Sequence, residues 1–157
     1  MRGHVPMVQY SYKHDRISAL AALSVSARRK RMGLYVRFQQ ENFHAGDVAN
    51  FLRQLLHHLR GPVILLWDHG RIHTGPIVGK LREDYPRLYV EWFPGYAPEL
   101  NPVEFIWSDF KGHSANRLLL DKQDIRLHLH GSTRRVRRSQ DRLRAFVLAS
   151  ELPSPPW

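Results

Sequence analysis

Residues 63 to 68 read Val-Ile-Leu-Leu-Trp-Asp: five apolar residues that follow Pro62 directly and end at an acid. Such a continuous apolar run is typical of a strand buried on both faces, as in the middle of an α/β sheet. Asp68 then lies at the carboxyl end of that strand, where such sheets gather their functional side chains. An Asp at a strand exit is also common as a turn or helix-cap residue, so Asp68 alone assigns no function.

Upstream of this strand, the sequence predicts a hairpin and then a helix. Residues 17 to 25, ISALAALSV, indicate a strand or a short helix, and residues 34 to 38, LYVRF, alternate as a strand does. A basic turn over residues 28 to 33 separates the two. From Asp47, apolar residues recur every three or four positions until Gly61, which predicts an amphipathic helix.

Downstream of Asp68, the pattern predicts helix, strand and helix. Thr74 is a candidate cap for a helix that has Pro76 in its first turn, and residues 88 to 93 read as a strand. A loop rich in proline and glycine leads to Asn101, a second cap candidate, with Pro102 at the first helical position. The apolar positions that define the two helical faces are Ile77, Val78 and Leu81, and then Val103, Ile106, Trp107 and Phe110.

The order of these elements predicts a mixed sheet with helices packed on its faces. Beyond residue 120 we expect two basic helices, although Ile125, Leu127 and Leu129 also alternate as in a strand.

The composition bounds the chain to a single globular domain. At 157 residues it can bury one core, and 43% hydrophobic residues exclude a disordered chain. No run approaches about 18 apolar residues, so we expect no membrane span, and residues 1 to 10 lack the apolar stretch of a signal peptide. The absence of cysteine excludes disulfides and thiolate metal sites and suits a reducing cytoplasm.

The formal net charge of +10 points to a polyanionic partner, most simply nucleic acid. The excess falls in two runs, Arg28, Arg29, Lys30 and Arg31 in the first, and Arg134, Arg135, Arg137 and Arg138 in the second. One such run can simply be a solvated surface. Two on one chain predict salt-sensitive contacts with DNA phosphates.

Glu104 lies three residues after Asn101, a spacing that also fits a capping box, in which the acid only closes the start of a helix. At about 100° per residue, Glu104 falls on the flank of the buried helical stripe, beside Lys111, so its carboxylate can border the sheet and remain in water. Asp109 falls on the other flank, which excludes an ion shared with Glu104 and indicates a surface charge.

Residues 63 to 111 resemble the core of the DDE superfamily endonucleases, in the group of mariner-like insertion-sequence transposases. That group carries a strand ending in Asp, a His a few residues later, and a Pro-rich segment ending in Leu-Asn-Pro-x-Glu that enters a helix continuing with Trp and Lys. The matching residues here are Asp68, His73, Pro94, Pro98, Leu100, Asn101, Pro102, Glu104, Trp107 and Lys111. Thirty-five residues, 69 to 103, separate the two acids, close to the family's gap in the mid-thirties.

The resemblance implies a ribonuclease H-like fold that binds two divalent ions, normally Mg²⁺ with Mn²⁺ as a substitute, for phosphodiester cleavage and strand transfer on DNA. It implies that Asp68 and Glu104 are the catalytic metal ligands. It also implies that His73 orients the Asp68 loop or contacts a phosphate, and that Asn101 and Pro102 set the angle of the helix that presents Glu104.

The same resemblance suggests how the chain is organised and what it binds. Residues 1–120 are the expected catalytic core and residues 121–157 a basic helical extension. Transposon ends and target DNA are the expected partners, Lys111 joins the basic runs as a candidate DNA contact, and a homodimer is a family expectation. We expect a cytoplasmic, DNA-associated protein.

The family uses three carboxylates, and the first lies in a strand that precedes the hairpin. Before Asp68 this chain offers Asp15, Glu41 and Asp47, none of which is embedded in an apolar strand. We therefore expect the first Asp, its strand and the N-terminal helix-turn-helix region to be missing, which predicts very weak activity for this chain alone. The missing strand normally lies mid-sheet, so its absence predicts open strand edges. A truncated or decayed gene product and a complementing N-terminal polypeptide both fit.

Two other functions are compatible with the sequence. The basic runs and the lost carboxylate also suit a non-catalytic DNA-binding protein that interferes with a full-length transposase. A zinc hydrolase site could use Asp68, His69 and His73 with His128 or His130, but no HExxH-type helix is present.

Overall fold

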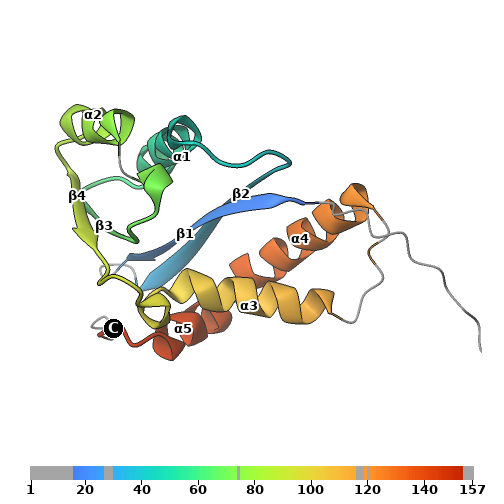
Figure 1. Cartoon of the computed structure of the whole chain (residues 1–157). Coiled ribbons are helices and arrows are strands. Elements are labelled where there is room, and N and C mark those ends of the chain that lie inside the picture. The colour runs from blue at the N-terminus through green and yellow to red at the C-terminus, as the bar shows by residue number, and fades with distance from the viewer. Residues whose placement is uncertain (1–15, 27–29, 74, 116–118, 120, 154–157) are drawn as a thin grey trace, which may run out of the picture.

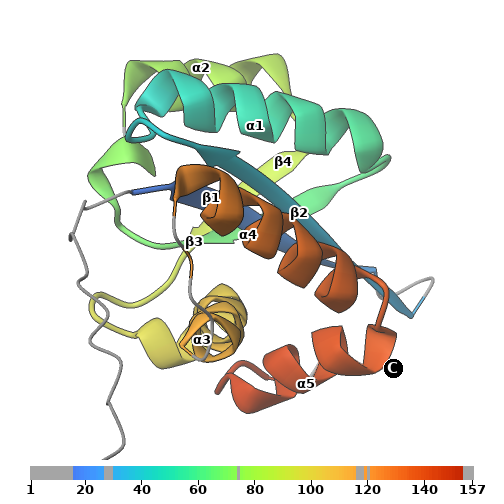
Figure 2. The same cartoon turned by 90° about the vertical axis from the view of Figure 1, so that its right-hand side faces the viewer.

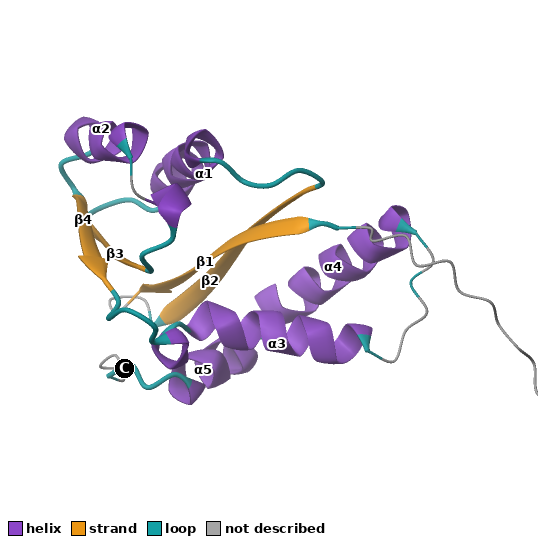
Figure 3. Cartoon of the chain, in the orientation of Figure 1, coloured by secondary structure: helices purple, strands orange, loops and turns teal. Residues whose placement is uncertain are grey.

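The computed structural model describes residues 16–26, 30–73, 75–115, 119 and 121–153, with the exception of the side chain of residue 71. In Figures 1 and 3, α1 and α2 lie above the β-hairpin and α3, α4 and α5 lie below it. The elements are β1 (Ser18–Ser26), β2 (Arg31–Gln39), α1 (Ala45–His58), β3 (Val63–Trp67), η1 (Arg71–His73), α2 (Pro76–Asp84), β4 (Leu88–Trp92), η2 (Pro98–Leu100), α3 (Pro102–Ser114), α4 (Lys122–Arg137) and α5 (Gln140–Ala149). Thr74, Arg28, Arg29 and Asp15 lie outside the described residues.

Strands β1 and β2 form the predicted antiparallel hairpin, which pairs Ser18 with Gln39 and Ser26 with Arg31. The small apolar segment of β1 is therefore a strand and not a helix. Strand β2 begins earlier than predicted and includes Gly33, which the sequence assigns to the turn. Gly33 lies opposite Ser24, and a Cβ atom at position 33 would be only 2.9 Å from the Ser24 hydroxyl, so a larger residue there would force the Ser24 side chain to move.

Strands β3 and β4 form a separate parallel pair, in which Val63 lies opposite Leu88 and Trp67 opposite Trp92. The α/β class is as predicted, but the described strands form two pairs and not one continuous sheet. Among the described residues, β1 pairs only with β2, and β3 only with β4. One edge of β1 and one edge of β3 therefore have no neighbouring strand, as the open-edge prediction requires.

Helices α1 and α2 pack on one face of β3 and β4. Val63, Leu65 and Trp67 of β3 contact this core, whereas Ile64 and Leu66 on the other face are 70% and 45% exposed. The predicted burial of both faces of β3 is therefore wrong, because these helices cover one side only. The core residues of this half are Val48, Leu52, Leu55, Leu56, Trp67, Val78, Leu81 and Leu88. Ile77, predicted on the buried face of α2, is 46% exposed.

The start and end of α1 are held by polar contacts. The backbone N–H of His44 donates to the Asp47 carboxylate over 3.0 Å. That hydrogen bond lowers the pKa of Asp47 below its ordinary value of 3.8. At the other end, the Arg87 guanidinium donates to the carbonyl oxygens of Leu56, Leu59 and Gly61. Asp47 is thus the third helical residue and not the first, because α1 begins at Ala45.

Helices α3, α4 and α5 pack against the hairpin from the other side, and Figure 2 shows α4 running along it. The core of this half consists of Met32, Leu34, Ile106, Phe110, Val136, Leu143 and Val147. The predicted pair of basic helices after residue 120 is confirmed, so the alternation at residues 125 to 129 is not a strand. Among the described residues, no helix combines the length and apolar character that crossing a bilayer requires.

Side chains from this layer protect the outer edge of β2. The Gln140 side chain accepts a hydrogen bond from the Met32 N–H over 2.9 Å and donates to the Met32 carbonyl over 3.0 Å. The Arg137 Nε–H donates to the Leu34 carbonyl over 2.8 Å. The backbone groups of β2 that point away from β1 are therefore satisfied at these positions.

Candidate active site

Asp68 lies directly after β3, and its side chain is 53% exposed. Its Oδ1 atom accepts a hydrogen bond from the Gly70 N–H over 2.9 Å and lies 2.6 Å from Nδ1 of His73 in η1. The exposed carboxylate is thus fixed in direction by the turn that follows it. The structure brings His73 to Asp68, as the sequence predicts.

Gly70 is a further residue of the candidate site, between Asp68 and His73. A Cβ atom at this position would meet Asp68 Oδ1 at 2.9 Å and His73 Nδ1 at 3.2 Å. Any side chain would therefore displace one of these two groups. The only signal for this role is the glycine between Asp68 and His73, which does not reveal the close approach.

Aromatic rings fix the two strand ends that meet at Asp68. The ring of His73 packs against Trp67 with centroids 4.5 Å apart, and Trp67 stacks on Trp92. His69 stacks on the other strand end, 5.2 Å from Trp92, with Nε2 2.9 Å from the Phe93 carbonyl oxygen. The Phe93 N–H donates to the Trp67 carbonyl over 2.8 Å. Asp68 therefore follows a strand end that is held to its neighbour by aromatic contacts and a backbone hydrogen bond.

Glu104 lies in the first turn of α3, where the side chain is exposed. The Asn101 side chain caps this helix by accepting a hydrogen bond from the Val103 N–H over 3.1 Å, and Pro102 is the first helical residue, both as predicted. The Asn101 N–H donates to the Pro98 carbonyl, so the capping-box role of Glu104 is not used. Within the described residues, the Glu104 carboxylate makes no hydrogen bond or ion pair. It is free for a ligand.

The path of the chain links the two acids. Phe93, beside the end of β3, starts the loop that passes through η2 into α3 and so to Glu104 (Figure 1). Asp68 and Glu104 supply hard carboxylate oxygens. Mg²⁺ is usually held by one or two carboxylates together with water and substrate phosphates, so this donor set suits that ion.

The described residues contain no group of three or more His, Asp or Glu side chains that could hold a metal. They therefore contain no complete protein cage. The zinc reading also gains no support from the histidines, because His69 and His73 contact Phe93 and Asp68, and His130 contacts the Phe38 ring edge.

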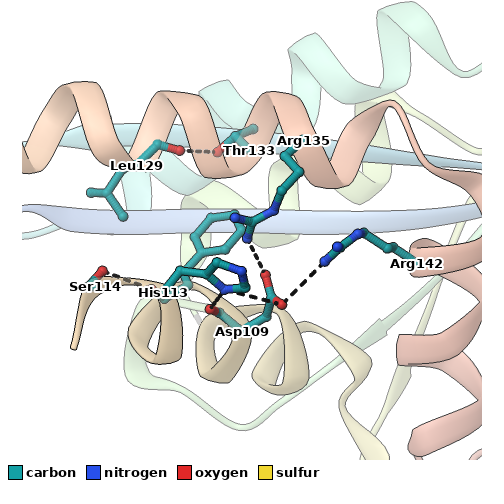
Figure 4. A network of polar contacts seen from close by, with 8 residues as sticks. Asp109, His113, Ser114, Leu129, Thr133, Arg135 and Arg142 are labelled. Carbon is teal, nitrogen blue, oxygen red and sulfur yellow. Dashed lines mark hydrogen bonds and ion pairs between the residues drawn. The ribbon is translucent and has the colours of Figure 1, made fainter. Parts of the chain in front are cut away.

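Asp109 is the centre of an ion-pair network that joins α3, α4 and α5 (Figure 4). Its carboxylate lies 2.8 Å from Arg135, 3.7 Å from Arg142 and 3.6 Å from His113. The side chain of Asp109 is only 17% exposed, so its interpretation as a surface charge is wrong. Arg135, a predicted DNA contact, faces this network.

The other predicted DNA-binding residues separate into two groups. Arg137 donates to the β2 backbone, whereas Arg134 and Arg138 are exposed on α4. Lys111 is exposed on α3. Lys30 and Arg31 are exposed at the hairpin turn. The last five stay candidates for DNA contact.

The chain is thus an α/β protein with an exposed acid at the end of β3 and another in the first turn of α3. A family model described as DDE superfamily endonuclease matches residues 1–126. This match covers most of the chain, which therefore belongs to the DDE superfamily endonucleases. No curated protein matches the chain.

Solved structures of similar fold include those of Mos1 transposase. The catalytic domain of Mos1 mariner transposase has a TM-score of 0.53 and 18% identity, covering 87% of this chain and 82% of that chain. The Mos1 catalytic domain with raltegravir and Mg has a TM-score of 0.51 and 15% identity, covering 90% and 86%. The Mos1 paired-end complex with the left transposon end has a TM-score of 0.54 and 16% identity, covering 95% of this chain and 48% of that chain. The ribonuclease H-like fold class of the chain is thereby confirmed.

Proposed function

We propose that this chain is the catalytic part of a metal-dependent DNA transposase, which cleaves and joins phosphodiesters at transposon ends. The observation that carries the proposal is the pair of exposed acids, Asp68 at the end of β3 and Glu104 in the first turn of α3, within a DDE superfamily endonuclease. Neither acid is neutralised by Lys or Arg within the described residues. The similarity to Mos1 transposase structures supports DNA as the substrate.

In this proposal each residue of the site has a distinct task. Asp68 and Glu104 hold Mg²⁺ or Mn²⁺ through their oxygens. The chemistry that such an ion would supply is activation of the attacking water or DNA 3′-hydroxyl and charge stabilisation at the leaving oxygen. His73 and the Gly70 N–H orient Asp68 through Oδ1, and Asn101 fixes the helix start that presents Glu104.

The proposal also includes the incomplete ligand set. The described residues offer no third acid beside Asp68 and Glu104. We therefore propose that this chain alone has very weak activity and that an additional strand carrying an Asp, supplied upstream or by a complementing polypeptide, completes the site. Residues 121–157 serve as the basic extension of the core formed by residues 1–120, and a homodimer on paired DNA ends is the proposed assembly.

Metal binding tests the site without requiring turnover. Tb³⁺ is a probe for hard oxygen sites, and its luminescence is sensitised by nearby tryptophans such as Trp67 and Trp92. We expect Tb³⁺ luminescence that Mg²⁺ competes away and that Asp68→Asn or Glu104→Gln strongly reduces. The matched control is Asp84→Asn, at the exposed end of α2, which should leave the signal unchanged. Equal signals from all variants would show that the site assignment is wrong.

Activity tests the function itself. Joined to a polypeptide that carries the first Asp strand, the chain should nick DNA containing transposon ends when Mg²⁺ is present. Asp68→Asn and Glu104→Gln should each reduce nicking to background, and Asp84→Asn should not. If both site variants nick as well as the parent, the two acids are not catalytic.

A second candidate function, a non-catalytic DNA-binding protein, is favoured by the net charge of +10 and by the exposed arginines of α4. It predicts salt-dependent DNA binding that is unaffected by Mg²⁺ or by Asp68→Asn. Filter binding at several salt concentrations, combined with the nicking assay, separates the two functions: binding without any restored nicking supports the second.

A further inference from the structure

Helix α4 carries a row of exposed basic side chains four residues apart: Arg126, His130, Arg134 and Arg138, the last at the helix C-cap. We call these four residues the α4 basic row. Side chains at this spacing are neighbours on a helix surface. The row turns by about 120° around the axis over its length, so all four stay on one side of the helix.

The arginines near the end of α4 differ in whether their guanidinium groups contact other parts of the protein. Arg135 binds Asp109 and Arg137 binds the Leu34 carbonyl, so both have structural partners. Among the described residues, Arg126, Arg134 and Arg138 have no carboxylate within ion-pair distance. Within the described residues, the exposed guanidinium groups of Arg126, Arg134 and Arg138 therefore have neither a counter-charge nor a structural role like those of Arg135 and Arg137.

An unpaired row of one sign has a physical cost. Like charges at four-residue spacing repel each other and destabilise a helix. A surface that only needs solubility mixes charges of both signs. A row without interleaved acids therefore indicates a polyanion that neutralises it on binding.

The geometry suits the backbone of duplex DNA. The row from Arg126 to Arg138 spans about 18 Å at the helical rise, and duplex DNA carries about ten phosphates over that length. A membrane-binding helix would need an apolar face beside the cations. The apolar face of α4 instead packs on β2, α3 and α5, and Leu127 is the one large apolar side chain that stands exposed on α4 in the described residues.

We propose that the α4 basic row binds the phosphate backbone of duplex DNA. His130 is held by the Phe38 ring, with centroids 5.4 Å apart, and fills the row between Arg126 and Arg134. The inference deepens the proposed function by naming its DNA-contact surface, and it does not depend on the two candidate metal ligands.

The test compares two variants of equal net charge. The row variant is Arg126→Gln, Arg134→Gln and Arg138→Gln. The control variant changes three exposed residues to Gln: Arg60, which follows α1, and Lys80 and Arg82 of α2. Helices α1 and α2 lie on the other side of the hairpin from α4 (Figure 1). Affinity for a random-sequence DNA duplex is measured at several salt concentrations by fluorescence anisotropy.

Each lost phosphate contact lowers the slope of log K against log salt by about 0.9. We expect the row variant to lose a slope of about 2.7 and at least about 10-fold in affinity at low salt. The control variant should keep the parental slope. Equal losses in both variants would overturn the proposal, because they would show an effect of net charge and not of this surface.

Two further measurements keep the result interpretable. Replacing the three arginines by lysine should preserve the slope, and thermal unfolding should show that the row variant remains folded. Tb³⁺ luminescence of the row variant should equal that of the parent. If the parent gives no Tb³⁺ luminescence but the salt slope falls in the row variant alone, the proposed active site is contradicted and the α4 proposal stands. If the Tb³⁺ luminescence is normal but the row variant keeps the parental slope, only the α4 proposal is contradicted.

Discussion

The geometry of the candidate site depends on the absence of a side chain at Gly70. Its N–H holds Asp68, and there is no room for a methyl group between Asp68 and His73. We predict that Gly70→Ala turns the Asp68 carboxylate away from its present direction. Because a supporting residue of a metal site is altered, the affinity for Tb³⁺ should fall by about 10-fold.

Stability separates this effect from a general loss of structure. Gly70 lies in a partly exposed turn outside both cores, so Gly70→Ala should shift the unfolding free energy by less than about 1 kcal/mol. The matched control is Gly79→Ala on α2, where a Cβ atom meets nothing within 4 Å. Unchanged Tb³⁺ affinity in Gly70→Ala would show that the contact does not position Asp68.

Asp109 affects the packing of whole helices against one another. It lies on α3 and neutralises Arg135 of α4 and Arg142 of α5, so one carboxylate holds three helices. We predict that Asp109→Asn lowers the unfolding free energy by about 1–3 kcal/mol, because Arg135 is left partly buried without a counter-charge. Urea unfolding measures the change.

A double-mutant cycle identifies the cause. Arg135→Met in the Asp109→Asn background should recover part of the loss, since the uncompensated charge is removed. Additive losses in the cycle would show that the two side chains are not coupled. DNA affinity should change little in Arg135→Met, because the charge of this arginine is already paired with Asp109.

The elements themselves were largely predictable because their signals are local. The apolar spacing of α1, the alternation of β2, and the Asn101-Pro102 start of α3 each depend on neighbouring residues. The contact between Asp68 and His73 was also predictable, since the two residues are only five positions apart. These features follow from backbone geometry and need no knowledge of the remaining fold.

The missed features depend on contacts between distant segments. No sequence pattern near Asp109 predicts that it pairs with Arg135, which is 26 positions away. Periodicity identified β3 as a strand but did not reveal that one of its faces is left uncovered. Hydrophobicity reports what a side chain prefers, and only the packed molecule shows whether a partner is present.

At the scale of the whole molecule, the exposed face and open edge of β3 predict self-association. Ile64 is 70% exposed, and no strand among the described residues pairs with the free edge of β3. Unpaired edges beside apolar side chains are templates for pairing with other chains. We predict that Ile64→Lys raises the monomer fraction in sedimentation velocity experiments over a range of protein concentrations.

A control on another surface distinguishes this cause from added charge. Leu148 on α5 is 60% exposed, and Leu148→Lys adds the same charge away from the strand edges. It should leave the monomer fraction as in the parent. If both variants dissociate the protein equally, electrostatic repulsion and not the β3 face controls association.

The protection of β2 by Gln140 and Arg137 then has a practical meaning. These two side chains cover backbone groups on the free edge of β2. Among the described residues, the free edges of β1 and β3 have no neighbouring strand and remain open to pairing with another chain. We therefore expect aggregation through the free edges of β1 and β3 to limit the yield of expression and refolding. Dilution of the protein or Ile64→Lys should raise this yield more than substitutions that stabilise the helices.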